Sequence, residues 1–127
     1  MPYPTDDVNR YRDFQKTVLN KEDSYAGIEK IDIEFLREYM QPAKRFTEKY
    51  PDKILWCGEF GTIRHCDITY RENWMRDMIT VLKEWDIPYC VWNYLSTPND
   101  GNRFSLVDDD KRLILSEKLG EIIRGNV

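Results

Sequence analysis

Residues 53–61 have the sequence KILWCGEFG, and the first six of them, residues 53–58, form a short apolar run between turn-forming residues. A run of this length is typical of a strand that is buried on both faces, as in parallel sheets. A second run of the same kind, residues 88–94 with the sequence PYCVWNY, follows after a segment with helical periodicity. We therefore predict two parallel strands, near residues 53–58 and 88–93.

Apolar side chains at three- and four-residue spacing predict three helices around these strands. The first should begin after Asp32 as its N-cap, and Pro42 within it should kink the helix or split it in two. The second opens with residues 69–72 (TYRE), which fit the capping-box pattern. The third should end at Gly125. The predicted helices lie near residues 32–49, 70–86 and 110–123.

The order of these elements is that of an α/β fold, an α(βα)2 segment over residues 32–127 with a right-handed crossover between its strands. Residues 1–31 are polar and rich in turn formers, so we interpret them as a loop-rich lead-in in which residues 9–19 suit a helix. The chain has 127 residues. A complete (β/α)8 barrel usually needs about 250 residues, so residues 1–127 are predicted to form a single, partial domain.

The composition excludes several classes of function. Nineteen Lys and Arg against 23 Asp and Glu give a net charge of -4, which offers no strong attraction to nucleic acid. No apolar stretch approaches the roughly 18 residues of a membrane span, and residues 1–7 lack the features of a secretion signal. Three cysteines and one histidine match neither a disulfide framework nor a zinc site. We therefore expect no membrane span and no metal site.

Chemistry is expected at the carboxyl ends of the two strands, where functional loops leave a parallel sheet. Glu59 follows the first strand between two glycines that leave little bulk around it and permit unusual backbone angles, and Trp92 ends the second strand. Alternation predicts that Glu59 shares a face with Leu55 and Cys57, and Trp92 with Cys90. A carboxylate beside an indole suits a sugar, because the indole covers the apolar ring face while the carboxylate meets positive charge at the anomeric carbon.

Three segments carry a resemblance to a known family. Residues 54–64 (ILWCGEFGTIR) resemble the seventh-strand nucleophile segment of glycoside hydrolase family 5, the cellulase family. Residues 91–94 (VWNY) resemble the eighth-strand segment with its sugar-stacking tryptophan, and residues 104–108 (FSLVD) are similar to the stretch before the final helix. The resemblance covers about residues 25–125 and implies the carboxy-terminal portion of a TIM (β/α)8 barrel, a partial glycoside hydrolase domain.

Carried over by position, the resemblance implies that Glu59 is the catalytic nucleophile of a retaining hydrolase and Trp92 the platform under the sugar. It further implies that Tyr3 corresponds to a tyrosine that hydrogen-bonds the nucleophile, and that Asn93 and Arg64 reach the cleft from loops. The general acid of this family is a Glu after an Asn, and no Asn-Glu pair occurs in this sequence. We expect an endoglucanase-like fragment that acts on β-glucan or a related polysaccharide and is nearly inactive alone. The resemblance implies that this chemistry needs no cofactor.

Two other interpretations stay open on the sequence. The chain could be a non-catalytic α/β module that binds carbohydrate or protein through its aromatic edge, or an interaction domain in which the GEFG sequence is coincidental. A fragment would leave the barrel-facing residues Leu55, Cys57, Cys90 and Trp92 exposed unless the lead-in, a second copy or a complementary barrel half covers them. The resemblance implies an extracellular parent protein, whereas the location of this chain stays open.

Overall fold

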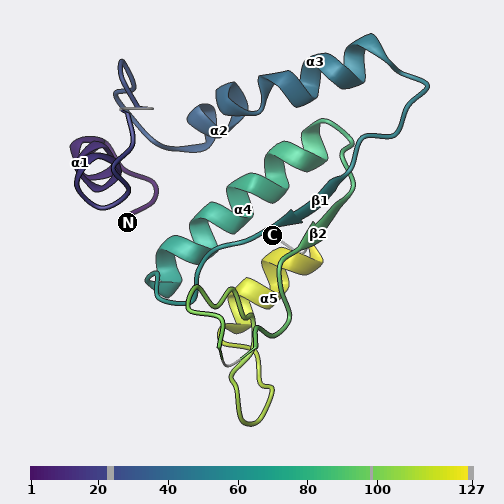
Figure 1. The fold of residues 1–127 in the computed structure, drawn as a ribbon. Helices are drawn as coiled ribbons and strands as arrows, with labels where there is room; N and C mark the ends of the chain where they lie inside the picture. Colours follow the sequence, from purple (N-terminus) through teal and green to yellow (C-terminus); the bar gives the residue numbers. More distant parts are fainter. Residues whose placement is uncertain (23–24, 98, 126–127) are drawn as a thin grey trace.

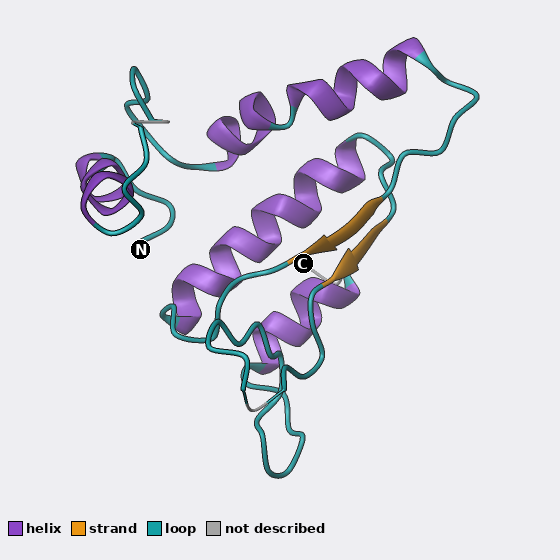
Figure 2. Cartoon of the chain, viewed as in Figure 1, coloured by secondary structure: helices purple, strands orange, loops and turns teal. Residues whose placement is uncertain are grey.

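The computed structural model describes residues 1–22, 25–97 and 99–125. Two short parallel strands pair with each other, and α4 connects them (Figures 1 and 2). The predicted strand–helix–strand order and the parallel pairing are therefore confirmed. In chain order the elements are α1 (Asn9–Thr17), α2 (Ile33–Tyr39), α3 (Gln41–Lys49), β1 (Cys57–Phe60), α4 (Ile68–Glu84), β2 (Tyr89–Val91) and α5 (Glu117–Arg124).

The predicted first helix is split, as its proline indicates. Asp32 caps α2, because its carboxylate accepts hydrogen bonds from the backbone N–H groups of Glu34 at 3.0 Å and Phe35 at 3.3 Å. Helix α2 ends at Tyr39 with Met40 as its C-cap, and α3 begins directly after Met40 with Pro42 in its first turn. A proline is tolerated there because the first N–H groups of a helix have no partner within the helix.

Helix α4 begins before the predicted capping box. Its N-cap is Asp67, whose carboxylate accepts the N–H of Thr69 at 2.8 Å, so the predicted cap at residues 69–72 is wrong. Because Asp67 caps the helix, Thr69 lies inside its first turn and cannot be the cap. Glu72 is buried instead, and it accepts a hydrogen bond of 2.6 Å from the hydroxyl of Ser116, the N-cap of α5.

The last helix is shorter than the predicted range 110–123. The Asp108 carboxylate holds a tight turn, and three backbone N–H groups in that turn lower the pKa of this carboxyl. Arg112 follows with a φ of 59°, a left-handed conformation that an α-helix does not contain. Helix α5 therefore starts only at Glu117, and Gly125, with a φ of 78°, caps its end as predicted.

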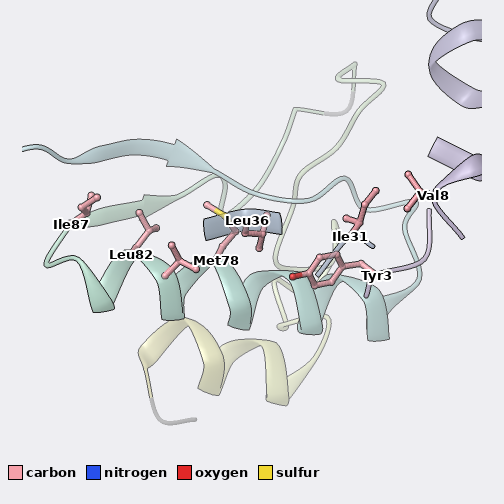
Figure 3. Packing of buried hydrophobic residues seen from close by; sticks show 8 residues of the cluster. Tyr3, Val8, Ile31, Leu36, Met78, Leu82 and Ile87 are labelled. Atoms are coloured by element: carbon pink, nitrogen blue, oxygen red, sulfur yellow. The ribbon is translucent and has the colours of Figure 1, made fainter. Parts of the chain in front are cut away.

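Two clusters of buried apolar side chains hold the elements together. The smaller cluster joins α4 to α5 beside the strands, and the larger joins the lead-in to α2 and α4 (Figure 3). The lead-in also forms paired backbone hydrogen bonds between Thr5 and Ile31. Through the larger cluster, the described part of the lead-in packs against α2 and α4 and not on the barrel-facing side of the strands. The larger cluster contains Tyr3, Val8, Ile31, Leu36, Met78, Val81, Leu82 and Ile87.

Within the described residues, no helix has the length and apolarity to cross a membrane.

Candidate active site

The pairing of β1 with β2 brings Glu59 and Trp92 to one side of the sheet. Phe60 is in register with Val91, and the backbone N–H of Trp92 donates to the backbone carbonyl of Phe60 at 2.7 Å. Phe60 and Val91 both pack against the cluster formed by α4 and α5. Successive residues of a strand point to opposite faces, so Glu59 and Trp92, each next to one of these two, point away from the helices.

The alternation along β1 differs from the prediction. Leu55 and Cys57 pack against the helix-side cluster, and burial raises the pKa of the Cys57 thiol. A register shift between Cys57 and Phe60 then turns Glu59 to the opposite face, so the predicted common face with Leu55 and Cys57 is wrong. Gly58 within the strand is the one sequence signal for this irregularity, because a glycine there often marks a bulge.

We call the side of the sheet that points away from α4 and α5 the open face; it carries Trp56, Glu59, Cys90 and Trp92. Trp56 is 59% exposed and Trp92 is 47% exposed, and Glu59 and Cys90 are exposed as well. The predicted exposure of Cys90 and Trp92 is confirmed, while that of Leu55 and Cys57 is not. Sequence reasoning missed Trp56, because uninterrupted alternation assigns it to the face opposite Glu59.

Gly61 allows the ends of the two strands to come close together. A Cβ atom at this position would lie 2.0 Å from the Trp92 carbonyl oxygen and 3.3 Å from the Phe104 ring. A Cβ atom on Gly58 would meet only the Trp56 ring, at 3.8 Å. Neither glycine has a positive φ. Of the two glycines around Glu59, only Gly61 occupies a position that has no space for a side chain. The reason is the close approach of its backbone to Trp92, and not an unusual backbone angle.

Gly61→Ala is expected to destabilise the chain by about 1–3 kcal/mol, because the new methyl group forces the Trp92 backbone away from β1. Gly58→Ala is the matched control, since its methyl group meets the Trp56 ring at an ordinary distance. Urea unfolding followed by tryptophan fluorescence measures both variants. Equal unfolding midpoints for the two variants would contradict the close approach of residue 61 to Trp92.

Two of the predicted cleft residues have partners in the loops. Arg64 forms an ion pair with Asp109 at 2.8 Å, which Arg103 shares at 2.9 Å, and the two guanidinium groups lower the pKa of the Asp109 carboxyl. The Asn93 side-chain oxygen accepts a hydrogen bond of 3.1 Å from the Ser96 hydroxyl. Both side chains therefore fix the loops beyond the strands, and neither is directed to Glu59 by these contacts.

Tyr3 lies away from Glu59, in contrast to the prediction. Its side chain is 3% exposed within the larger core cluster, and its hydroxyl donates to the Asp77 carboxylate of α4 at 2.9 Å. Burial and this hydrogen bond raise the pKa of the Tyr3 phenol. The reason for the difference is that the apolar residues of the lead-in pack on the helix side of the sheet.

Acidic side chains near the strand ends serve as caps. Asp67 accepts the Thr69 N–H, Asp100 accepts the Asn102 N–H at 3.0 Å, and Asp108 holds the turn before α5. The pKa of the Asp108 carboxyl is lowered by its backbone hydrogen bonds, which does not suit a general acid, and the other two carboxylates are engaged as caps of their turns. Across residues 1–22, 25–97 and 99–125, no group of three or more His, Cys, Asp or Glu side chains could hold a metal ion.

Comparisons with known proteins place these elements in a larger fold. No protein-family model matches the chain. Endoglucanase C of Acetivibrio thermocellus is 36% identical over 95 residues, which are 75% of this chain and 26% of that protein. Endoglucanase C307 of Clostridium sp. (strain F1) matches with the same identity and coverage. The chain thus spans about a quarter of the length of these curated relatives.

Solved structures give the same fold. A hyperthermophilic endo-β-1,4-glucanase in complex with substrate superposes with a TM-score of 0.61 and 19% identity, over 73% of this chain and 27% of that one. Thermotoga maritima Cel5A in complex with mannotriose superposes with a TM-score of 0.60 and 18% identity, over 90% of this chain and 36% of that one. These neighbours are (β/α)8 barrels, so the chain has the fold of a part of such a barrel.

Proposed function

We infer function from the premise that this chain belongs to the glycoside hydrolase family 5 endoglucanases and corresponds to a carboxy-terminal part of their barrel. The family consists of glycosidases. We propose that Glu59 is the nucleophile of a retaining enzyme that cleaves β-linked polysaccharide, and that the chain lacks the acid/base group. The observation that carries the proposal is the presentation of Glu59 and Trp92 on one open face, at the carboxyl ends of adjacent parallel strands.

The proposed reaction has two steps. In the first, a Glu59 carboxylate oxygen forms a bond to the anomeric carbon while the glycosidic bond breaks and the leaving oxygen takes a proton from an acid outside this chain. In the second, water attacks the same carbon, the ester bond to Glu59 breaks, and the sugar leaves with its original anomeric configuration. General acid assistance contributes roughly 10²–10⁴-fold, so the chain alone should be nearly inactive.

Trp92 has a separate role in the proposal. Its indole is half-exposed, and its backbone N–H donates to the carbonyl of Phe60, the residue after Glu59, so the two residues stand at adjacent strand ends. An indole in this position can stack on the apolar face of the sugar ring whose anomeric carbon Glu59 attacks. The substrate that the names of the relatives favour is a β-1,4-glucan.

A dinitrophenyl fluoro-cellobioside tests the nucleophile in the chain as it exists. Dinitrophenolate leaves without protonation, so the missing acid is not needed, and the fluorine slows hydrolysis of the ester that forms. We expect one fluoro-cellobiosyl group per chain by intact mass, located on the peptide that contains Glu59. Glu59→Gln should abolish the label, whereas Glu48→Gln, an exposed carboxylate of α3, should keep it.

Labelling, together with calorimetry on the Glu59→Gln variant, decides between the enzyme and a non-catalytic carbohydrate-binding module. The exposed indoles of Trp56 and Trp92 favour glycan binding in either case. A binding module would bind cello-oligosaccharides in calorimetry with the same affinity before and after Glu59→Gln, and it would not be labelled. That result would replace the proposed nucleophile with a binding function.

A further inference from the structure

Arg71 is a buried arginine near the start of α4, and it is only 2% exposed. Its Nε donates a hydrogen bond to the Thr62 hydroxyl at 3.1 Å, and its Nη2 donates to the Ser105 carbonyl at 3.0 Å. Thr62 lies in the loop that follows β1, and Ser105 lies in the loop that follows β2. Both loops pass beside the beginning of α4 (Figure 1). One guanidinium group therefore joins the loops at the carboxyl ends of the two strands.

The contact with Thr62 leads to the proposed nucleophile. Thr62 is the third residue after Glu59, and it directly follows Gly61, whose backbone lies against the Trp92 carbonyl. The segment after Glu59 is therefore held at two neighbouring points, by its close approach to Trp92 at residue 61 and by Arg71 at residue 62.

The contact with Ser105 leads to the sugar platform. The Ser105 hydroxyl accepts the Ser96 N–H at 2.9 Å, and the Ser96 hydroxyl donates to the Asn93 side-chain oxygen at 3.1 Å. Both serines are buried. The Asn93 carbonyl accepts the Leu106 N–H at 3.1 Å. Asn93 directly follows Trp92, so this network fixes the backbone that carries the indole.

The charge of Arg71 is not explained by packing. Both of its acceptors are neutral groups, so the guanidinium is buried without a paired carboxylate among the residues that the structure describes. Burial lowers the pKa of this guanidinium, but an arginine keeps its charge because its ordinary pKa lies far above neutral pH. Burying an unpaired charge costs free energy, and an apolar side chain would avoid that cost. The arginine therefore indicates a need for two directed hydrogen bonds at this place.

We propose that Arg71 is a positioning residue, which holds Glu59 and Trp92 in the mutual placement that attack on the anomeric carbon requires. The inference rests on the proposed function. A displacement of about 1 Å at the reacting groups can cost roughly 10²-fold in rate, so a reaction of this kind depends on such a support. Arg71 acts through Thr62 and Ser105 and not by contact with the sugar.

The test measures the rate at which the dinitrophenyl fluoro-cellobioside labels Glu59 in the full chain, at increasing reagent concentration. The saturating rate constant reports on attack, and the half-saturating concentration reports on binding. Arg71→Lys keeps the charge but not the planar fork of donors, so it should lower the saturating rate constant about 10–100-fold and change the half-saturating concentration less than about threefold. Arg76→Lys is the matched control, because Arg76 lies on the same helix and contacts Asn73 and Asp77.

The two kinetic constants distinguish positioning from a loss of stability. A variant that is only partly folded binds the reagent more weakly in proportion to its folded fraction, but the reagent-bound chain reacts at the normal rate. A raised half-saturating concentration with an unchanged saturating rate constant would therefore overturn the proposal. An Arg71→Lys variant with both constants unchanged would overturn it as well.

A second variant removes the acceptor in place of the donor, and it decides alone if circular dichroism shows that Arg71→Lys does not fold. Thr62→Val should lower the saturating rate constant about tenfold, whereas Thr80→Val, which removes a hydroxyl that donates to the Arg76 carbonyl, should not. The double variant of Arg71→Lys and Thr62→Val should label no more slowly than Arg71→Lys, because both changes break one interaction. Losses that multiply, or an unchanged rate in Thr62→Val, would overturn the proposed link.

Amide hydrogen exchange separates this inference from the proposed nucleophile. Arg71→Lys should speed exchange of the Ser96 and Leu106 N–H groups at least about tenfold, and Arg76→Lys should not. Faster exchange, with no label on the unaltered chain, would refute the nucleophile and retain Arg71 as the link between the loops. Labelling at the same rate with and without Arg71→Lys would retain the nucleophile and overturn the role of Arg71. Neither labelling nor faster exchange would overturn both.

Discussion

Replacing Glu59 with alanine should reduce cellulose hydrolysis by about 10³-fold or more in a complete barrel. A loss of this size is expected because the variant has no carboxylate to attack the anomeric carbon. The barrel for this measurement is Endoglucanase C with its aligned segment replaced by this chain. We expect the Endoglucanase C part of such a protein to supply the acid/base group, so the loss reports on residue 59 alone. Release of reducing sugar from carboxymethylcellulose gives the rate, and Glu48→Ala on α3 should leave it unchanged.

Azide distinguishes a nucleophile from an acid in the Glu59→Ala variant. The missing side chain leaves space for azide, which can attack the anomeric carbon of a dinitrophenyl β-cellobioside directly. A single displacement inverts the configuration, so the product should be the α-cellobiosyl azide. Formation of the β-azide, or full activity without azide, would contradict the role of Glu59 as the attacking carboxylate.

Leu82→Ala is expected to lower the free energy of unfolding of the chain by about 2–5 kcal/mol, the usual cost of a cavity in a packed core. Its side chain is 0% exposed in the cluster that joins the lead-in to α2 and α4. Leu113→Ala is the matched control, because that leucine is 62% exposed and its loss should cost less than about 0.5 kcal/mol.

Urea unfolding followed by circular dichroism compares the two leucine variants. A lower midpoint for Leu82→Ala with an unchanged slope would show that the core contributes stability in the isolated chain. Equal midpoints would mean that the cluster around Leu82 does not pack when the chain is alone. The same result would remove the anchor that we assign to the lead-in, since Tyr3, Val8 and Ile31 belong to this cluster.

Elements governed by neighbours in the chain were predictable. The two apolar runs gave the parallel strands, Asp32 capped its helix, and the helical stretch divided near Pro42. The resemblance of residues 54–64 and 91–94 identified the family, which the comparison with endoglucanases confirmed. Local prediction failed where two capping signals compete, as at the start of α4. The sequence offers both Asp67 and Thr69 as N-caps, and only one of them can begin the helix.

The sequence by itself determined the order of helices and strands, the parallel pairing and the positions of Glu59 and Trp92 at strand ends, because periodicity and capping act within a few residues. Only the tertiary structure decided that Glu59 shares its face with Trp56 and not with Cys57, and that Tyr3 binds Asp77 of α4. The face of the sheet to which a side chain points depends on the register between the strand and its partner. The position of the lead-in depends on the apolar surface that α2 and α4 present to it. Both come from residues distant in the chain, so no local pattern contains them.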